Sequence, residues 1–284
     1  MNSIVKPRAL PRSPSQQKAR PRAHERMKPP SALLLALEGR AMFEYAAFAM
    51  AWPLLRRAPR GDGHPVMVLP GLGVGDNTTW PLRAFLEHLG YAVHPWEQGA
   101  NFGPRDHTVR KLVDRVRAIE KQHAQPVTLV GWSLGGAMAS ALALRMPERV
   151  RQVVTLGSPL TGHPRGTNVW RLFEIVSGFR ADDERLMSLL DDEPSVPTTA
   201  IMSKTDGIVN WRMSLAPDAR RCENIEVSAT HLGMGANPAV LWAIADRLAQ
   251  ARGQWRPFDR NASAWRSLLF RDPHQFRLAD LIAP

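Results

Sequence analysis

The chain has 284 residues, 44% of them hydrophobic, and a formal net charge of +11 at pH 7. That length and apolar content suffice to bury one large core, and the single cysteine, Cys222, excludes an intrachain disulfide. The composition therefore predicts one globular domain whose excess positive charge must be located along the chain.

The first thirty residues hold most of that excess charge. Residues 1–30 carry eight Lys or Arg residues against one acid, Glu25, together with six prolines. A segment this charged cannot bury enough apolar surface to offset its ordering entropy, so we predict a disordered tail. We favour a solvated tail without a partner. Peripheral contact of its charge with anionic lipid headgroups is the alternative, and no specific nucleic-acid site is predicted.

Residues 31–63 form an apolar segment. Its core, Ser31–Leu55, is interrupted by Glu38, Arg40 and Glu44. Each such charge near the centre of a membrane-spanning helix would cost about 2.5–3.5 kcal/mol, which disfavours a spanning helix. The helical spacing of the apolar residues predicts instead a helix on the body of the fold or on a membrane surface. We expect a cytoplasmic location, with membrane association as the open alternative.

Strands alternate with helices over residues 64–250. Apolar, β-branched runs predict strands near 66–69, 91–94, 127–131, 150–156, 198–203 and 223–228. Other runs with helical spacing predict helices near 79–89, 105–123, 134–146 and 237–250. Such alternation is typical of a mostly parallel sheet with helices on both faces, so the predicted fold class is α/β.

A glycine-rich loop, Pro70–Gly75, follows the first predicted strand. Loops of this kind often cradle phosphates. This one has neither the G-x-x-x-x-G-K-[ST] motif nor the spacing of G-x-G-x-x-G. A phosphate or dinucleotide site is therefore not predicted here.

A serine stands in the turn between the third predicted strand and the helix after it. The stretch Gly131-Trp132-Ser133-Leu134-Gly135 has G-x-S-x-G spacing. A sharp turn of this kind exposes the hydroxyl above the sheet, beside the N–H groups at the helix start. We interpret Ser133 as a nucleophile. A glycine-rich turn with an idle serine is the alternative.

The alternation breaks at residues 160–194. This segment is too short for a domain, and it ends in a second helical stretch, Asp182–Leu190. We predict a small lid of two helices over the serine. Most of its apolar side chains would pack the lid onto the body, and one or two would face the serine. These apolar residues are Trp170, Leu172, Phe173, Ile175, Val176 and Phe179.

An acid and a histidine follow the last two predicted strands. Asp206 comes just after the strand near 198–203, and His231 just after the strand near 223–228. Carboxyl ends of parallel strands meet at one edge of a sheet, so these residues are expected beside Ser133. Each alone fits a turn or loop residue. Together, in the order serine, acid, histidine, they indicate a catalytic triad.

Residues 251–284 extend beyond the last predicted helix. Trp255, Phe258, Trp265 and Phe270 lie there among arginines. We expect this extension to pack back onto the core or to form a contact surface.

These motifs resemble those of the α/β-hydrolase superfamily, within it the bacterial lipases, esterases and related acyltransferases. The points of resemblance are Leu69-Pro70-Gly71-Leu72-Gly73, the turn at Ser133, and Thr155-Leu156-Gly157-Ser158-Pro159. The resemblance covers about residues 64–250 and neither end of the chain. The lone cysteine departs from the larger secreted lipases.

The resemblance implies a serine hydrolase that cleaves carboxylic esters through an acyl-serine. Ser133 would attack the acyl carbonyl, His231 would carry the proton, and Asp206 would orient the imidazole. The backbone N–H groups of Leu72 and Leu134 would form the oxyanion hole. No metal or organic cofactor is expected, and the substrate would be a small-molecule or lipid ester.

Several alternatives stay open. Acyltransferases and thioesterases use the same triad. A non-catalytic binding protein on the same fold is less favoured, because Ser133, Asp206 and His231 are all present. His163 is the second candidate base. The fallback acids are Asp182, Asp183, Asp191 and Asp192.

Overall fold

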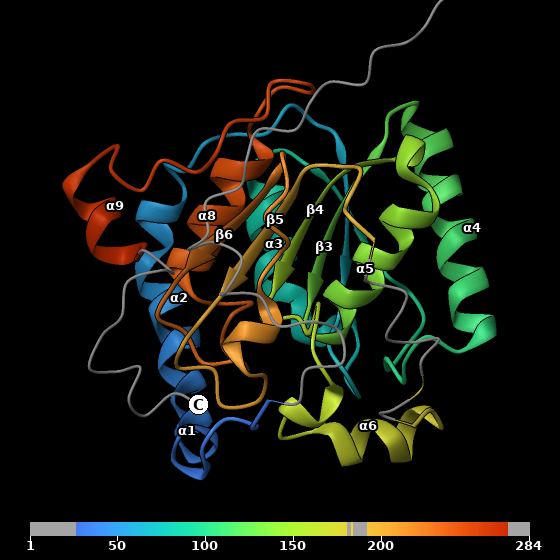
Figure 1. The fold of residues 1–284 in the computed structure, drawn as a ribbon. Coiled ribbons are helices and arrows are strands. Elements are labelled where there is room, and N and C mark those ends of the chain that lie inside the picture. Colours follow the sequence, from blue (N-terminus) through green and yellow to red (C-terminus); the bar gives the residue numbers. More distant parts are fainter. Residues whose placement is uncertain (1–26, 181–182, 184–191, 272–284) are drawn as a thin grey trace, which may run out of the picture.

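Six parallel strands form the sheet at the centre of the computed structural model, which describes residues 27–180, 183 and 192–271 (Figure 1). The strands are β1 (Pro65–Leu69), β2 (Ala92–Pro95), β3 (Val127–Trp132), β4 (Val150–Leu156), β5 (Thr198–Met202) and β6 (Cys222–Glu226). Their order in the sheet is β2-β1-β3-β4-β5-β6, and every adjacent pair is parallel. All six carboxyl ends therefore lie at one edge, where the sites of open α/β sheets form.

Helices cover both faces of this sheet (Figure 1). The covering helices are α2 (Ala41–Leu55), α3 (Trp80–His88), α4 (Asp106–His123), α5 (Leu134–Arg145) and α8 (Pro238–Leu248). Because side chains alternate along a strand, Val66 and Val68 of β1 pack with α2, α3 and α8, whereas Met67 and Leu69 pack with α4 and α5. This arrangement confirms the predicted α/β class.

Shorter helical elements complete the described chain. They are α1 (Ala32–Ala36), η1 (Leu37–Arg40), η2 (Asp76–Thr79), η3 (Pro147–Arg149), η4 (Pro164–Gly166), α6 (Trp170–Ser177), η5 (Trp211–Ser214) and α9 (Ala264–Leu269). Of the predicted lid, the helix α6 is present, while the stretch Asp182–Leu190 falls almost entirely outside the described residues.

Local signals explain why the predicted strands and helices of residues 64–250 lie within two residues of the observed ones. Helix α8 begins at Pro238, whose fixed φ suits a first helical position. The side chain of Asn237 caps that helix by accepting the N–H groups of Ala239 and Val240. Helix α4 ends at His123, and the next residue, Ala124, adopts the left-handed conformation common after a helix.

The apolar N-terminal segment packs on the body of the fold. Phe48 and Leu55 of α2 are buried in the core that α3 and α8 share. The expected helix is interrupted by η1, where the side chain of Glu38 is buried inside the protein. The opposite face of the segment is exposed at Leu33, Leu35, Met42, Phe43, Met50 and Leu54. Within the described ranges, no helix is long and apolar enough to cross a membrane.

The described part of the C-terminal extension also packs on the body. Phe270 is almost fully buried, and its ring meets that of Phe258 edge-on at 4.7 Å between centroids. The N–H of Arg271 donates to the carbonyl of Glu226 at the end of β6, at 3.1 Å. These contacts agree with the first of the two expectations for this extension.

Candidate active site

Ser133 lies in a strained turn at the carboxyl edge of the sheet. It stands between β3 and α5 with φ 54° and ψ −124°, a positive φ that residues with a Cβ rarely adopt. Its neighbours leave no space for side chains. A Cβ on Gly131 would meet the backbone of Gly136, and one on Gly135 would meet the carbonyl of Leu69. The two glycines of the motif are therefore required by the close approach of strand, helix and loop.

The glycine-rich loop after β1 packs directly against this turn. A Cβ built on Gly71 would lie 3.4 Å from Cβ of Ser133. Leu72 and Leu134, the predicted oxyanion donors, line the same pocket as Ser133. The structure thus brings Leu72, Leu134 and Ser133 together at the N-terminus of α5.

Asn101 fixes that loop, and sequence reasoning missed it. Its buried side chain donates from Nδ2 to the carbonyl of Pro70 at 2.8 Å, and the backbone carbonyl of Asn101 accepts the N–H of Gly73 at 2.7 Å. The sequence offered no signal, because an asparagine between Gly99 and Gly103 reads as an ordinary turn residue.

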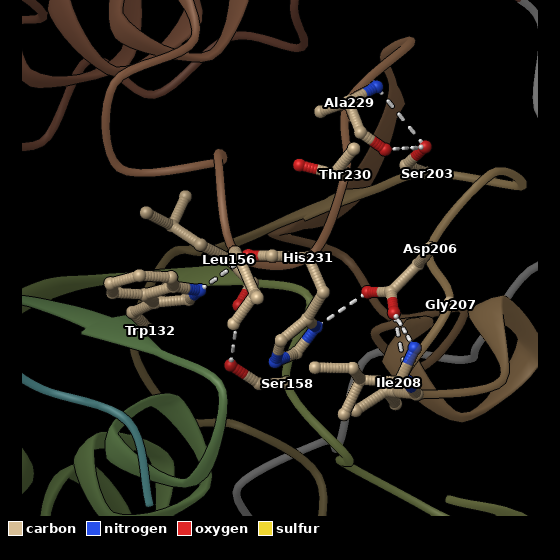
Figure 2. Close-up of polar contacts among 12 residues, drawn as sticks. Trp132, Leu156, Ser158, Ser203, Asp206, Gly207, Ile208, Ala229, Thr230 and His231 are labelled. Atoms are coloured by element: carbon tan, nitrogen blue, oxygen red, sulfur yellow. Dashed lines mark hydrogen bonds and ion pairs between the residues drawn. The ribbon is translucent and has the colours of Figure 1, made fainter. Parts of the chain in front are cut away.

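Asp206 and His231 form a buried hydrogen-bonded pair at the same edge (Figure 2). Oδ2 of Asp206 lies 2.6 Å from Nδ1 of His231. The other oxygen, Oδ1, accepts the N–H groups of Ile208 and Val209, each at 2.8 Å, which orients the carboxylate. With Nδ1 bound to the acid, Nε2 is the ring nitrogen left for chemistry.

The electrostatics of the pair favour the protonated imidazole. Burial by itself lowers the pKa of His231, because a charged ring loses its hydration. The charge of Asp206 and its hydrogen bond act in the opposite direction, and the charge of Glu38 adds to them. The net result is a pKa of His231 raised above its ordinary value.

Two further contacts join the histidine and acid to neighbouring strands. The indole N–H of Trp132, the residue before Ser133, donates to the carbonyl of His231 at 3.0 Å (Figure 2). At the end of β4, Gly157 has φ 54°, and a Cβ there would lie 3.0 Å from Oδ2 of Asp206. The glycine in the Thr155–Pro159 motif therefore leaves room for the pair.

The pocket beside Ser133 is mainly apolar. It has a volume of about 120 Å³, and α6 contributes Trp170 and Phe173 to its wall. Leu160, Val209 and Met213 line it from the loops after β4 and β5. Trp170 and Phe173 are therefore the aromatic side chains of the segment 160–194 that share this pocket with Ser133.

Of the fallback residues, His163 and Asp192 have surroundings other than the Asp206–His231 pair. His163 is buried before η4, where its Nδ1 accepts the N–H of Arg165 at 3.2 Å. Asp192 lines two other cavities, beyond α5. Asp182 and Asp191 fall outside the described residues.

Comparisons with known proteins agree with this geometry. A family model described as "alpha/beta hydrolase fold" matches residues 52–193. The chain is 40% identical over 98 residues to a pimeloyl-[acyl-carrier protein] methyl ester esterase of Shewanella woodyi, which covers 34% of this chain and 37% of that protein. It is 31% identical over 145 residues to a 2-hydroxymuconate semialdehyde hydrolase of Pseudomonas sp. (strain CF600). That match covers 46% of this chain and 48% of that protein. The chain thus aligns with less than half of each of these relatives.

A solved structure shows the same fold. Lipase B of Aspergillus fumigatus superposes with a TM-score of 0.55 at 17% identity, covering 78% of this chain and 56% of that one. The strained serine turn, the parallel sheet and the family match define one class: the chain belongs to the α/β-hydrolase family.

Proposed function

We propose that the protein is a serine hydrolase that cleaves carboxylic esters through an acyl-serine intermediate. The proposal rests on the 2.6 Å hydrogen bond between Asp206 and His231, buried at the same sheet edge as the strained Ser133. A histidine oriented by a carboxylate can accept the proton of a serine hydroxyl. The esterase named among the relatives supports the same reaction class.

In the proposed mechanism, Oγ of Ser133 attacks the acyl carbonyl carbon as its proton passes to Nε2 of His231. Asp206 stabilises the imidazolium, and the N–H groups of Leu72 and Leu134 bind the oxyanion. The same proton then passes to the leaving alcohol as the ester C–O bond breaks. A water that loses a proton to His231 next attacks the carbonyl carbon of the acyl-serine. The bond from that carbon to Oγ then breaks, the acid is released, and His231 returns the proton to Oγ of Ser133.

The pocket supports an apolar acyl group as substrate. Arg180 also lines the pocket, but Trp170, Phe173 and Met213 give its wall an apolar character. Burying an alkyl chain against such a wall is favourable by about 0.8 kcal/mol per methylene. We propose that residues 160–194 serve as the lid, within a hydrolase domain of residues 64–250.

An alkyl fluorophosphonate and a series of p-nitrophenyl esters test the proposal together. We expect one label per chain, on Ser133, and no label on Ser133→Ala. Turnover should rise with acyl length until the pocket is filled and then fall. Labelling that survives Ser133→Ala would reject the nucleophile. Preferential transfer to an added alcohol or thiol would instead assign an acyltransferase, and a wild-type chain that binds esters without labelling would assign a binding protein.

We also propose that the exposed face of α1 and α2 contacts an anionic membrane surface. Met42, Phe43, Met50 and Leu54 are each more than half exposed on this face of α2. Arg56 and Arg57 stand exposed just beyond the helix, and the chain carries an excess of eleven positive charges. An apolar face edged by cations suits the boundary between acyl chains and anionic headgroups.

Sedimentation with vesicles of phosphatidylcholine, with and without phosphatidylglycerol, tests this contact. Replacing Phe43 and Met50 by serine should weaken binding to the anionic vesicles, and added salt should weaken it further. Leu268→Ser is the matched control, because Leu268 is 78% exposed on α9. Equal binding by all three proteins would contradict the proposal. Dimerisation that the double variant abolishes would show that a second copy covers this face.

A further inference from the structure

Glu38 of η1 is a buried carboxylate that bonds to two separate loops. Glu38 is only 4% exposed. Oε1 accepts the N–H of Gly207 at 2.7 Å and the N–H of His231 at 2.9 Å, and Oε2 accepts the N–H of Leu232 at 2.9 Å. Gly207 directly follows Asp206. One carboxylate thus joins the loop of the acid to the loop of the base.

Two glycines leave room for the segment that carries Glu38. A Cβ on Gly207 would collide with the backbone of Leu34 in α1, and one on Gly233 would collide with the carboxylate of Glu44 in α2. Neither glycine has a positive φ, so their backbone conformation does not require glycine. The N-terminal segment approaches both loops so closely that a side chain at position 207 or 233 would collide with it.

Glu44 provides a second, different connection. Its carboxylate accepts the N–H of Thr230 at 3.1 Å and the side-chain amide of Asn237 at 2.7 Å. Both partners belong to the chain after β6, so Glu44 holds the histidine loop alone. Of these two acids, only Glu38 bonds to the loop that carries Asp206.

We propose that Glu38 is a positioning residue that sets the placement of Asp206 relative to His231. This inference rests on the proposed catalytic function of that pair. Three charge-assisted bonds from backbone N–H groups fix both loops to one point. Without the carboxylate, three backbone donors, two of them in buried bonds, would lose their acceptor, and each loop could relax independently. Glu38 itself does not line the pocket at Ser133.

Two substitutions separate the geometric role of Glu38 from its charge. Glu38→Asp keeps the charge but shortens the reach by one methylene. Glu38→Gln keeps the reach but removes the charge and presents an NH₂ group to one of the N–H donors. Both should lower kcat by roughly 10²-fold with little change in KM, since misplacement of this size acts on the chemical step.

The pH profile of kcat/KM supplies a readout that a merely structural role would not move. The charges facing His231 are those of Asp206 and Glu38. Since Glu38 raises the pKa of His231, Glu38→Gln should shift the acid limb to lower pH, and Glu38→Asp should leave it in place. Glu44→Gln is the control at a half-buried carboxylate that bonds to the histidine loop alone, and it should lower Tm without moving that limb.

The rate of fluorophosphonate labelling distinguishes the two proposals. If the wild-type chain is not labelled at Ser133, the proposed function fails. If it is labelled, and folded Glu38→Asp is labelled and turns over at the wild-type rate, the positioning role of Glu38 is refuted. Should Glu38→Gln not fold, Glu38→Asp alone decides.

Discussion

Gly157 shows how closely single atoms are fitted around the candidate acid and base. A Cβ at this position would lie 3.0 Å from Oδ2 of Asp206 and 3.1 Å from Nδ1 of His231. Gly157→Ala should therefore displace the pair and lower kcat by roughly 10²-fold. Gly253→Ala is the control, because Gly253 also has a positive φ but nothing within 4 Å. A similar loss of activity in both variants would attribute the effect to backbone strain.

The carboxylate of Asp206 should be needed for its charge and not only for its shape. Asp206→Asn preserves the size of the side chain, but its amide cannot stabilise an imidazolium or hold the productive tautomer. By analogy with other triads, kcat should fall by roughly 10⁴-fold. Steady-state kinetics on a short-chain p-nitrophenyl ester measures this, and a loss below tenfold would argue for a different acid.

The pH dependence of hydrolysis should report the raised pKa of His231. The free base accepts the serine proton, so activity is lost as pH falls and the ring becomes protonated. Because the pKa of His231 lies above its ordinary value, the acid limb of kcat/KM should have its midpoint above about pH 6.5. A rate that stays level down to pH 5 would argue against a histidine base.

At the scale of elements, helix α2 has one buried and one exposed face. Phe48 is 8% exposed, while Met50, two residues later, is 82% exposed. Phe48→Ala should lower the free energy of unfolding by about 3 kcal/mol, because it removes a packed ring from the core shared with α3 and α8. Met50→Ala should change it by less than about 0.5 kcal/mol. Urea unfolding followed by circular dichroism compares the two.

The strands and helices of residues 64–250 could be predicted because their signals are local. Val127–Val130 is an apolar run, Pro147 stops a helix, and glycines flank Ser133. The side on which α2 would be buried could not be predicted. Its residues are apolar around most of the helix, so periodicity alone does not separate a face for the core from a face for a membrane.

The candidate site likewise contains residues that local sequence patterns predict and residues that they do not. Ser133, Asp206 and His231 follow strands in sequence, and the topology then brings them to one edge. Glu38 and Asn101 act through contacts across long stretches of chain, which no local pattern encodes. Glu38 even appeared as an interruption in an apolar segment, whereas the structure gives it three backbone partners.

For the whole molecule, the basic residues at the start of the chain should be dispensable for folding. Deleting residues 1–26 should leave Tm and the turnover of a soluble short-chain ester unchanged, because so charged a segment has little apolar surface to bury. A chain starting at Arg60 should instead aggregate or lose its cooperative transition, since it lacks Phe48, Leu55 and Glu38. Calorimetry and activity measured on both truncated chains check this. Full activity of the chain starting at Arg60 would show that α1 and α2 are not part of the hydrolase fold and serve to attach it to a membrane or a partner.

The bonds of Glu38 also have a consequence for biosynthesis. Its partners Gly207 and His231 are 169 and 193 residues further along the chain. On the ribosome, the carboxylate emerges long before the loops that will satisfy it, and contacts of such large sequence separation form late. Nascent chains released before His231 would therefore hold most of the sheet and the serine turn but no ordered acid–base pair. Catalytic competence should then appear abruptly, only after His231 has left the ribosome and its loop has bonded to Glu38.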